Sequence, residues 1–159
     1  MTPEEKLQKL GLELPSAPAP VGAYVPAVRT GTLILTAGQI PVRDGELLAA
    51  GKVPTDVPPD VAAAAAMQAA LNALAAIRQV LGDGETPGEL SRVVRVVRMN
   101  VFVNSAPGFT GQAGVANAAS ELLVGAFGEA GRHTRCAIGA AELPLNAPVE
   151  LDLVVEVRT

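Results

Sequence analysis

Residues 92–103 read RVVRVVRMNVFV, and half of them are valine. β-Branched residues fit the pleated surface of a sheet better than the surface of a helix, so this stretch predicts a long strand. One helical pattern precedes it at residues 60–81, and another follows it at residues 112–127. A strand between two helices indicates a domain in which helices pack on a sheet.

The helical segment at 60–81 is dominated by alanine, the residue with the highest helix propensity. So many alanines indicate close packing against a flat surface, such as the face of a sheet. Gly82 is expected to end this helix with a positive φ, and Gly128 and Gly131 are expected to end the helix at 112–127. The larger apolar residues of the first helix fall on one stripe: Met67, Leu71, Leu74 and Leu81.

The first part of the chain has three short patterns. Residues 1–12 predict a short amphipathic helix, because Leu7 and Leu10 are three residues apart with charges around them. Residues 14–26 are rich in proline and predict an extended lead-in. Residues 49–59, rich in glycine and proline, are expected to form a loop.

Five short segments have strand character. Asp44-Gly45 joins two of them and favours a two-residue hairpin, in which both residues need a positive φ. The last of the five alternates apolar with mostly charged residues, as a half-buried strand does. The five segments are 32–36, 40–43, 46–48, 134–141 and 149–158.

These elements follow the order β-β-β-α-β-α-β-β and predict one α+β domain over residues 1–159, with an N-terminal extension at 1–20. Both long helices are expected on one face of the sheet. The other face would retain apolar residues that a single domain does not leave in water. We therefore expect a closed homo-oligomer that buries this face. Its apolar residues are expected to include Val94, Val96, Ile138 and Val154.

The composition argues against several classes of function. Lys and Arg number 12 against 16 Asp and Glu, and there are only three Phe, one Tyr and no Trp. This balance does not favour a nucleic-acid partner, which requires basic surfaces and aromatic platforms. One Cys and one His leave no ligand set for a metal, and we expect no cofactor. No stretch resembles a membrane span or a signal peptide, so a cytoplasmic location is expected.

Arg135 is the residue most indicative of chemistry. It lies in the middle of the strand expected at 134–141, among small and apolar neighbours. A guanidinium is always charged and costly to bury alone, so Arg135 either pairs with an internal carboxylate or binds an anionic ligand. Its planar fork matches a carboxylate, which makes a small organic acid the expected ligand in the second case.

Three residues near Arg135 leave alternatives open. Asp152 is expected on the neighbouring strand, where it could pair with Arg135, act as a base that activates water, or lie on a solvated face. Cys136 could be activated by the adjacent charge or be a small apolar residue. His133 is expected at the surface, at the start of the strand.

Six short motifs, in one order along the chain, resemble those of the Rid/YjgF family of reactive-intermediate deaminases, also labelled the L-PSP endoribonuclease family. The resemblance runs from about Pro20 to Val157. The loop at 49–59 and the N-terminal extension are similar to those of a divergent branch. The motifs are Val21-Gly22-Ala23-Tyr24-Val25, Leu35-Thr36-Ala37-Gly38-Gln39-Ile40-Pro41, Val101-Phe102-Val103-Asn104, Thr134-Arg135-Cys136-Ala137, Leu143-Pro144 and Val149-Glu150-Leu151-Asp152.

The resemblance implies a chorismate-mutase-like fold and a homotrimer whose sheets form a barrel, with clefts between subunits. It also implies that Arg135 holds the carboxylate of a small 2-imino or enamino acid. Water would add to the imine carbon, and the adduct would collapse to a 2-keto acid and ammonia. Asp152 falls where the family commonly has Glu and is the expected catalytic partner. The further substrate-binding residues that the resemblance implies are Tyr24, Ala37, Gly38, Cys136 and Asn117, the last reaching across the interface.

Two departures from the family pattern keep other functions open. Ala37 replaces the usual Ser or Thr and removes a hydroxyl donor, and Asp152 is shorter than Glu by one methylene. Both changes favour a trimer that binds small carboxylates without chemistry or has a regulatory role. Endoribonuclease activity is a third alternative, against which the acidic charge and the single histidine argue.

Overall fold

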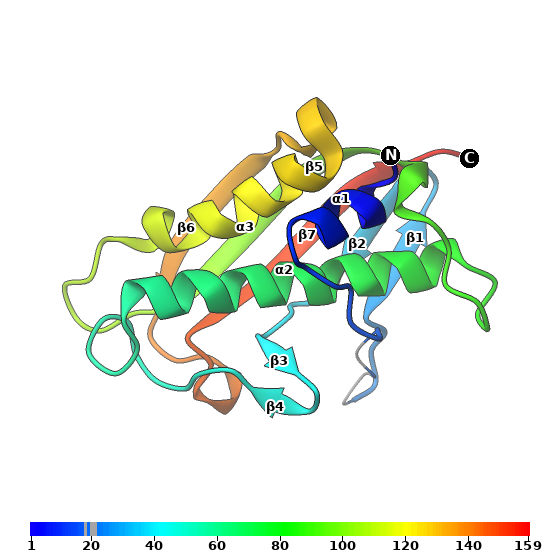
Figure 1. Ribbon diagram of the computed structural model, residues 1–159. Helices are drawn as coiled ribbons and strands as arrows, with labels where there is room; N and C mark the ends of the chain where they lie inside the picture. Colours follow the sequence, from blue (N-terminus) through cyan, green and yellow to red (C-terminus); the bar gives the residue numbers. More distant parts are fainter. Residues whose placement is uncertain (18, 20–21) are drawn as a thin grey trace.

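The computed structural model of the chain describes residues 1–17, 19 and 22–159. Its centre is a five-stranded sheet in the order β1-β2-β7-β5-β6, with the two long helices α2 and α3 on one face (Figure 1). A separate two-stranded hairpin pairs β3 with β4. Pro18, Pro20 and Val21, which belong to the predicted lead-in and the first family motif, lie outside the described residues.

The elements have the following bounds in chain order. The helices are α1 (Pro3–Lys9), α2 (Pro59–Leu81) and α3 (Gln112–Phe127), with short 3-10 turns η1 (Leu90–Arg92), η2 (Gly128–Gly131) and η3 (Pro144–Asn146). The strands are β1 (Ala27–Thr30), β2 (Leu33–Thr36), β3 (Val42–Arg43), β4 (Glu46–Leu47), β5 (Val93–Asn104), β6 (Thr134–Ala140) and β7 (Val149–Val157).

The α+β prediction is confirmed, with one element more than the sequence pattern suggested. The missed strand is β1, which pairs antiparallel with β2 and forms one edge of the sheet. Its four residues alternate too briefly to stand out from the lead-in before them. The hairpin at Asp44-Gly45 is confirmed, since both residues have the positive φ that it requires (53° and 81°).

The sheet is mixed. The predicted long strand, β5, pairs parallel with β6 on one side and antiparallel with β7 on the other. The helix α3 lies between β5 and β6 in the chain, and it makes the crossover that a parallel pair requires. Strand β6 is thereby the second edge of the sheet, opposite β1.

The core lies between the sheet and the two long helices. Every second residue of β7 faces the helices and is buried, from Val149 to Val157. The alanines of α2 allow the close approach to the sheet that the sequence predicts, and the interior positions of this helix are almost all buried. Helix α2 is long and apolar enough to cross a membrane, but most of it is covered by the rest of the fold.

Two glycines end the long helices in different ways. Gly128 follows α3 with φ of 63°, as expected. The expectation for Gly82 is wrong, because its φ is −86°. A Cβ at Gly82 would lie 1.9 Å from the Thr86 carbonyl oxygen, so the position requires glycine because the backbone passes close by.

The other face of the sheet has no helix over it and is called the open face below. It carries half-exposed apolar residues, among them Val28 and Ile138, which are 53% and 50% exposed. Val94 and Val154 are also exposed or half-buried, but Val96 is fully buried. The prediction for Val96 is wrong because β5 shifts register against β7 on either side of it, which breaks the simple alternation.

Candidate functional site

Arg135 lies on the edge strand β6, and its side chain points to the helix side of the sheet. Its Nη1 donates to Asn117 Oδ1 at 3.0 Å and to Ser120 Oγ at 3.1 Å, and its Nη2 lies 3.4 Å from the Ala113 carbonyl oxygen. All three acceptors are neutral and belong to α3. Among the residues that the structure describes, no carboxylate lies within ion-pair distance of this guanidinium. Its positive charge is therefore held in place but not neutralised.

The spacing of the sequence explains this arrangement. Asn117 and Ser120 are three residues apart on α3, so their side chains project from the same side of the helix. Arg135 pairs with Met99 of β5, and paired residues point to the same face of a sheet. Since Met99 is buried under the helices, Arg135 also faces them.

Asp152 does not lie beside Arg135, and the predicted adjacency is wrong. Strand β5 separates β6 from β7, and Asp152 pairs with Asn100 of β5. Asp152 lies on the open face, where its Oδ1 accepts a hydrogen bond of 2.8 Å from Asn100 Nδ2. Within one chain, Arg135 and Asp152 therefore cannot form an ion pair or contact the same small molecule.

Cys136 also lies on the open face, because consecutive residues of a strand alternate sides. It is exposed, and Arg98 Nη2 lies 3.2 Å from its Sγ. Arg98 Nε donates to Asn100 Oδ1 at 3.0 Å, so a chain of polar contacts runs from Cys136 to Asp152 across the face. The structure separates Cys136 from the guanidinium of Arg135.

Glu150 is a candidate that the sequence analysis did not select. It lies on the open face two residues before Asp152, and its carboxylate lies against Gly38, where a Cβ would be 2.1 Å from Glu150 Oε1. Burial raises the pKa of Glu150, and the negative charge of Asp152 raises it further. The signal in the sequence was the alternation of the last strand, which places both carboxylates on one side, two residues apart.

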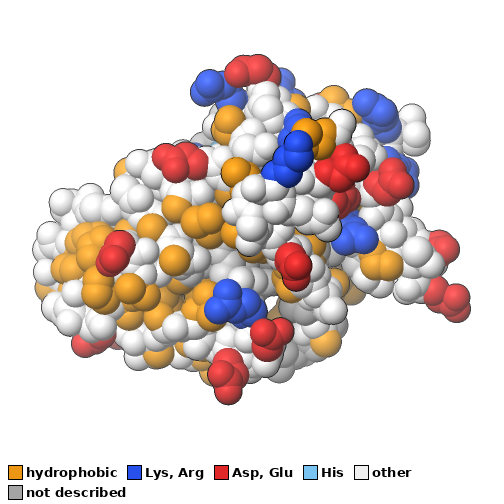
Figure 2. Space-filling view, viewed as in Figure 1, with side chains coloured by type: hydrophobic (Ala, Val, Ile, Leu, Met, Phe, Trp, Pro, Cys, Tyr) orange, Lys and Arg blue, Asp and Glu red, His pale blue; other side chains and the backbone are white. Residues whose placement is uncertain are grey.

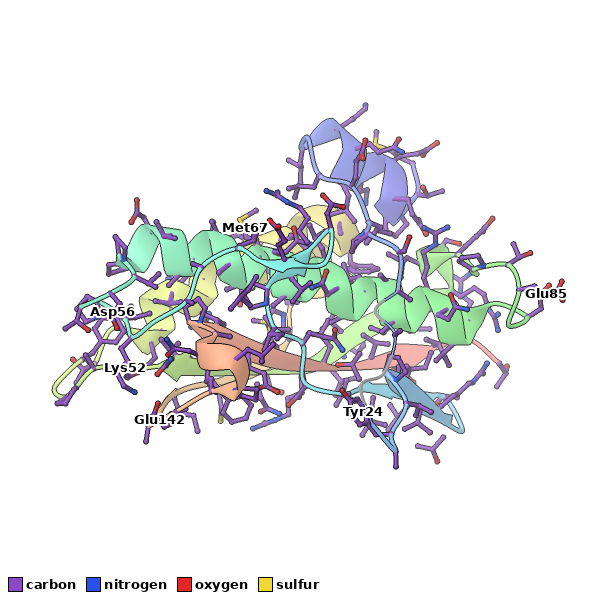
Figure 3. All side chains as sticks on the ribbon, turned by 90° about the horizontal axis from the view of Figure 1, so that it is seen from below. Tyr24, Lys52, Asp56, Met67, Glu85 and Glu142 are labelled. Carbon is purple, nitrogen blue, oxygen red and sulfur yellow. The ribbon has the colours of Figure 1, made fainter. Side chains whose placement is uncertain are left out.

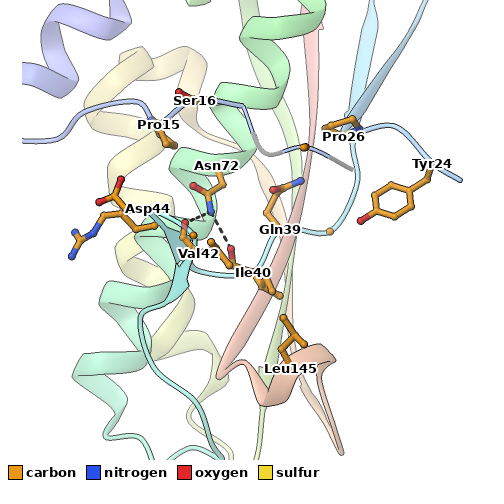
Figure 4. Close-up of a pocket in the computed structure, with 14 residues that line it drawn as sticks. Pro15, Ser16, Tyr24, Pro26, Gln39, Ile40, Val42, Asp44, Asn72 and Leu145 are labelled. Carbon is orange, nitrogen blue, oxygen red and sulfur yellow. Dashed lines mark hydrogen bonds between the residues drawn. The ribbon is translucent and has the colours of Figure 1, made fainter. Parts of the chain in front are cut away.

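A cavity of about 600 Å³ opens beside Gly38 (Figure 4). Tyr24 and Gln39 lie on one side of it, and Asn72 and Val42 on the other. Ala37 is next to this cavity, and its backbone N–H donates to the Pro26 carbonyl oxygen. The structure thus brings together Tyr24, Ala37 and Gly38 at one place, and Arg135 and Asn117 at another.

Polar residues of α2 hold one wall of this cavity. Asn72 Nδ2 donates to the carbonyl oxygens of Ile40 and Val42 at 3.0 and 2.9 Å (Figure 4). Gln68 Nε2 in turn donates to Asn72 Oδ1. Both amide side chains are more than nine-tenths buried. They fix the segment between Gly38 and the β3–β4 hairpin against the helix.

The loop at 49–59 is also well anchored. Its Lys52 Nζ donates to Asn104 Oδ1 at 3.0 Å and to the Ala141 carbonyl oxygen, and it lies 3.5 Å from Glu142 Oε2. Figure 3 shows Lys52, Glu142 and Asp56 at one end of the molecule, away from Tyr24. On the face shown in Figure 2, apolar side chains gather in the left part of the view, and positive and negative side chains lie intermingled in the right part.

The chain matches known proteins over almost its whole length. Residues 4–157 match the family model described as "YjgF/chorismate_mutase-like, putative endoribonuclease". Protein TCP17 of Trypanosoma cruzi is 44% identical over 96% of this chain and 92% of its own length. A RutC family protein of Haemophilus influenzae is 31% identical over 87% of this chain and 89% of its own.

A solved structure gives the same result for the fold. A protein of unknown function from Agrobacterium tumefaciens is 40% identical and superposes with a TM-score of 0.89, over 98% of this chain and 92% of that one. The matches span both groups of candidate residues, including the motifs quoted from the sequence. The chain belongs to the YjgF/chorismate-mutase-like family.

Proposed function

We propose that this protein hydrolyses small 2-imino or enamino acids to 2-keto acids and ammonia, in a cleft between two copies of the chain. The observation that carries the proposal is the environment of Arg135. Its guanidinium is held by three neutral acceptors and has no carboxylate partner among the described residues. A fixed cation of this kind suits the carboxylate of a small organic acid.

Two copies are needed because the candidate residues lie in two separate groups. Arg135 with Asn117 is at the β6 edge on the helix side, and Glu150 with Gly38 is on the open face. Strand β5 separates β6 from β7, and neighbouring strands are about 4.8 Å apart. In a cyclic oligomer, the β6 edge of one copy would approach the β1–β2 side of the next, and the two groups would meet. The homotrimer implied by the family resemblance would also cover the apolar open face.

Glu150 replaces Asp152 as the proposed proton carrier. A carboxyl group with a raised pKa accepts a proton more readily than an ordinary glutamate does, which suits a group that carries a proton between water and substrate. Glu150 would take one proton from water as the oxygen adds to the carbon of the protonated imine, which gives an adduct with one hydroxyl and one amino group. Glu150 would return that proton to the amino nitrogen. A lone pair of the hydroxyl oxygen then forms the carbonyl as the carbon–nitrogen bond breaks and ammonia leaves, and the hydroxyl proton passes to Glu150, so that the 2-keto acid remains. Asp152 acts through Glu150, because its negative charge contributes to the raised pKa.

The cavity beside Gly38 would take the rest of the substrate. Tyr24, Ile40 and Val42 contribute to its mostly uncharged lining. An apolar or neutral side chain on the imino acid would suit this lining, because burying a charge there without a partner would be costly.

The test is ammonia release from freshly generated 2-aminoacrylate. Arg135→Ala should lower kcat/KM by about a hundredfold, because the substrate carboxylate loses its charged partner. Arg132→Ala is the matched control, since Arg132 is exposed and bonded to Glu129. The control should retain the parental rate. Equal rates for Arg135→Ala and the parent protein would refute the proposal.

Ala37 supports a second candidate, a protein that binds small carboxylates without turning them over. The position lacks the hydroxyl that the family resemblance leads one to expect beside Gly38. Calorimetry with a 2-keto acid distinguishes the two functions, because binding that depends on Arg135 without release of ammonia would select this candidate. RNA cleavage is not proposed, since the net charge is −4 and the chain has a single histidine.

A further inference from the structure

His133 forms part of a hydrogen-bonded chain that ends at Arg135. Its Nδ1 lies 2.6 Å from the Gly131 carbonyl oxygen, and its Nε2 lies 3.0 Å from Ser120 Oγ. The same Ser120 Oγ accepts a hydrogen bond of 3.1 Å from Arg135 Nη1. His133 therefore does not simply occupy the surface at the strand start, because both of its ring nitrogens have partners.

The direction of each hydrogen bond in this chain is determined by the chemistry of its members. A carbonyl oxygen only accepts, so Nδ1 of His133 carries the proton and Nε2 of the neutral ring is an acceptor. The Ser120 hydroxyl must then donate to Nε2, which leaves its lone pairs for the guanidinium. The guanidinium of an arginine only donates hydrogen bonds. Arg135 therefore donates to Ser120 Oγ, and the Ser120 hydroxyl donates to Nε2 of the neutral His133 ring.

The sequence spacing builds this chain. His133 and Arg135 are two residues apart, so an extended backbone turns both side chains to the same side. Ser120 follows Asn117 by three residues on α3, which places both acceptors of Arg135 Nη1 on one side of that helix.

We propose that His133 and Ser120 are positioning residues, which hold the Arg135 guanidinium in the orientation that receives a substrate carboxylate. This assignment rests on the function proposed for Arg135. Without the Ser120 hydroxyl, Nη1 loses one of two acceptors and the guanidinium gains freedom to rotate. Ordering it again on binding would then lower the affinity for the ligand.

A first experiment tests the positioning without any substrate. Nitrogen-15 NMR of the labelled protein should show the neutral His133 ring as the Nδ1–H tautomer and the Arg135 Nε–H signal in slow exchange with water. Ser120→Ala should broaden or remove the Arg135 signal, and Ser120→Thr, which keeps the hydroxyl, should restore it. An unchanged Arg135 signal in Ser120→Ala would overturn the proposal.

A second experiment measures binding of pyruvate by calorimetry. Ser120→Ala and His133→Asn should weaken binding about tenfold, the scale of one hydrogen bond, whereas His133→Gln retains an acceptor near Ser120 and should recover most of the affinity. If Ser120→Ala and His133→Asn both bound pyruvate with the affinity of the parent protein, the positioning role would be contradicted.

The two experiments keep this inference apart from the proposed function. If Arg135→Ala binds pyruvate as well as the parent protein does, the proposed function is wrong, while the NMR comparison still decides whether His133 and Ser120 order the guanidinium. Thermal unfolding of each variant should match the parent, because Ser120 and His133 are only half-buried.

Discussion

The two faces of the five-stranded sheet are formed by alternate residues of the same strands, but only one of them is complete. On the helix side, every inward residue of β7 is aliphatic and almost without exposed surface. On the open face, apolar residues such as Val28 and Ile138 surround a polar row that includes Asp152 and Glu150. The difference shows that one chain encloses its own core but leaves its candidate catalytic carboxylate on a face that has no cover.

The largest effect is expected on the helix side. Leu153→Ala should lower the free energy of unfolding by about 2–5 kcal/mol, because Leu153 is fully buried and its truncation removes apolar contacts and leaves a cavity. Leu35→Ala, on the open face, is the matched variant and should unfold with a much smaller loss, since Leu35 is 37% exposed. Denaturant unfolding measures both. Equal losses of unfolding free energy would mean that the open face stabilises the fold as much as the helix side does, which would contradict the comparison.

A charge on the open face should act on assembly more than on folding. Ile138→Asp should give a folded chain that sediments as a monomer, because the charge would be buried against another copy. Val61→Asp is the control, since Val61 is exposed to a similar degree but lies in the first turn of α2, outside this face. A parental oligomer in Ile138→Asp would show that the open face is not the contact surface.

Gly38→Ala sharpens the comparison on the open face, at the contact between Gly38 and Glu150. The new Cβ would lie 2.1 Å from Glu150 Oε1, so the carboxylate must move. We expect about a tenfold loss of kcat/KM with little change in thermal stability, because the displaced group is a side chain and a small misplacement is enough to slow catalysis. Gly114→Ala, with no atom within 4 Å of its new Cβ, should leave the rate unchanged.

The smallest effect is a pH dependence of stability. The pKa of Glu150 is raised in the folded chain by burial and by Asp152, so the folded state holds this proton more tightly than the unfolded state does. The contribution of Glu150 to the free energy of unfolding therefore falls as pH rises from the ordinary glutamate pKa through the raised one. Glu150→Gln removes this fall and should gain stability relative to the parent with rising pH. Denaturant titrations at several pH values measure the difference in unfolding free energy between Glu150→Gln and the parent. A difference that stayed constant with pH would contradict the account.

Much of the fold could be predicted from the sequence because its signals are local. The alanine-rich helix, the hairpin at Asp44-Gly45 and the long valine-rich strand all follow from residue type and spacing. The order of strands in the sheet is not local, and Asp152 was wrongly placed next to Arg135 because β5 lies between their strands. Glu150 was missed for a related reason, since its contact with Gly38 joins residues 112 positions apart. Alternation along a strand predicts which face of the sheet a residue occupies, but it does not predict which residues of other strands lie beside it.

The most direct measurement mixes two variants that each lose most of their activity. Arg135→Ala and Glu150→Gln should each retain only a small residue of the parental rate, and each keeps the group that the other has lost. If every site takes Arg135 from one copy and Glu150 from the next, random co-assembly of equal amounts should restore about a quarter of the sites. The account predicts ammonia release from the co-refolded mixture near that fraction of the parental rate. A mixture as inactive as its components, with mixed oligomers demonstrated, would contradict a site shared between copies.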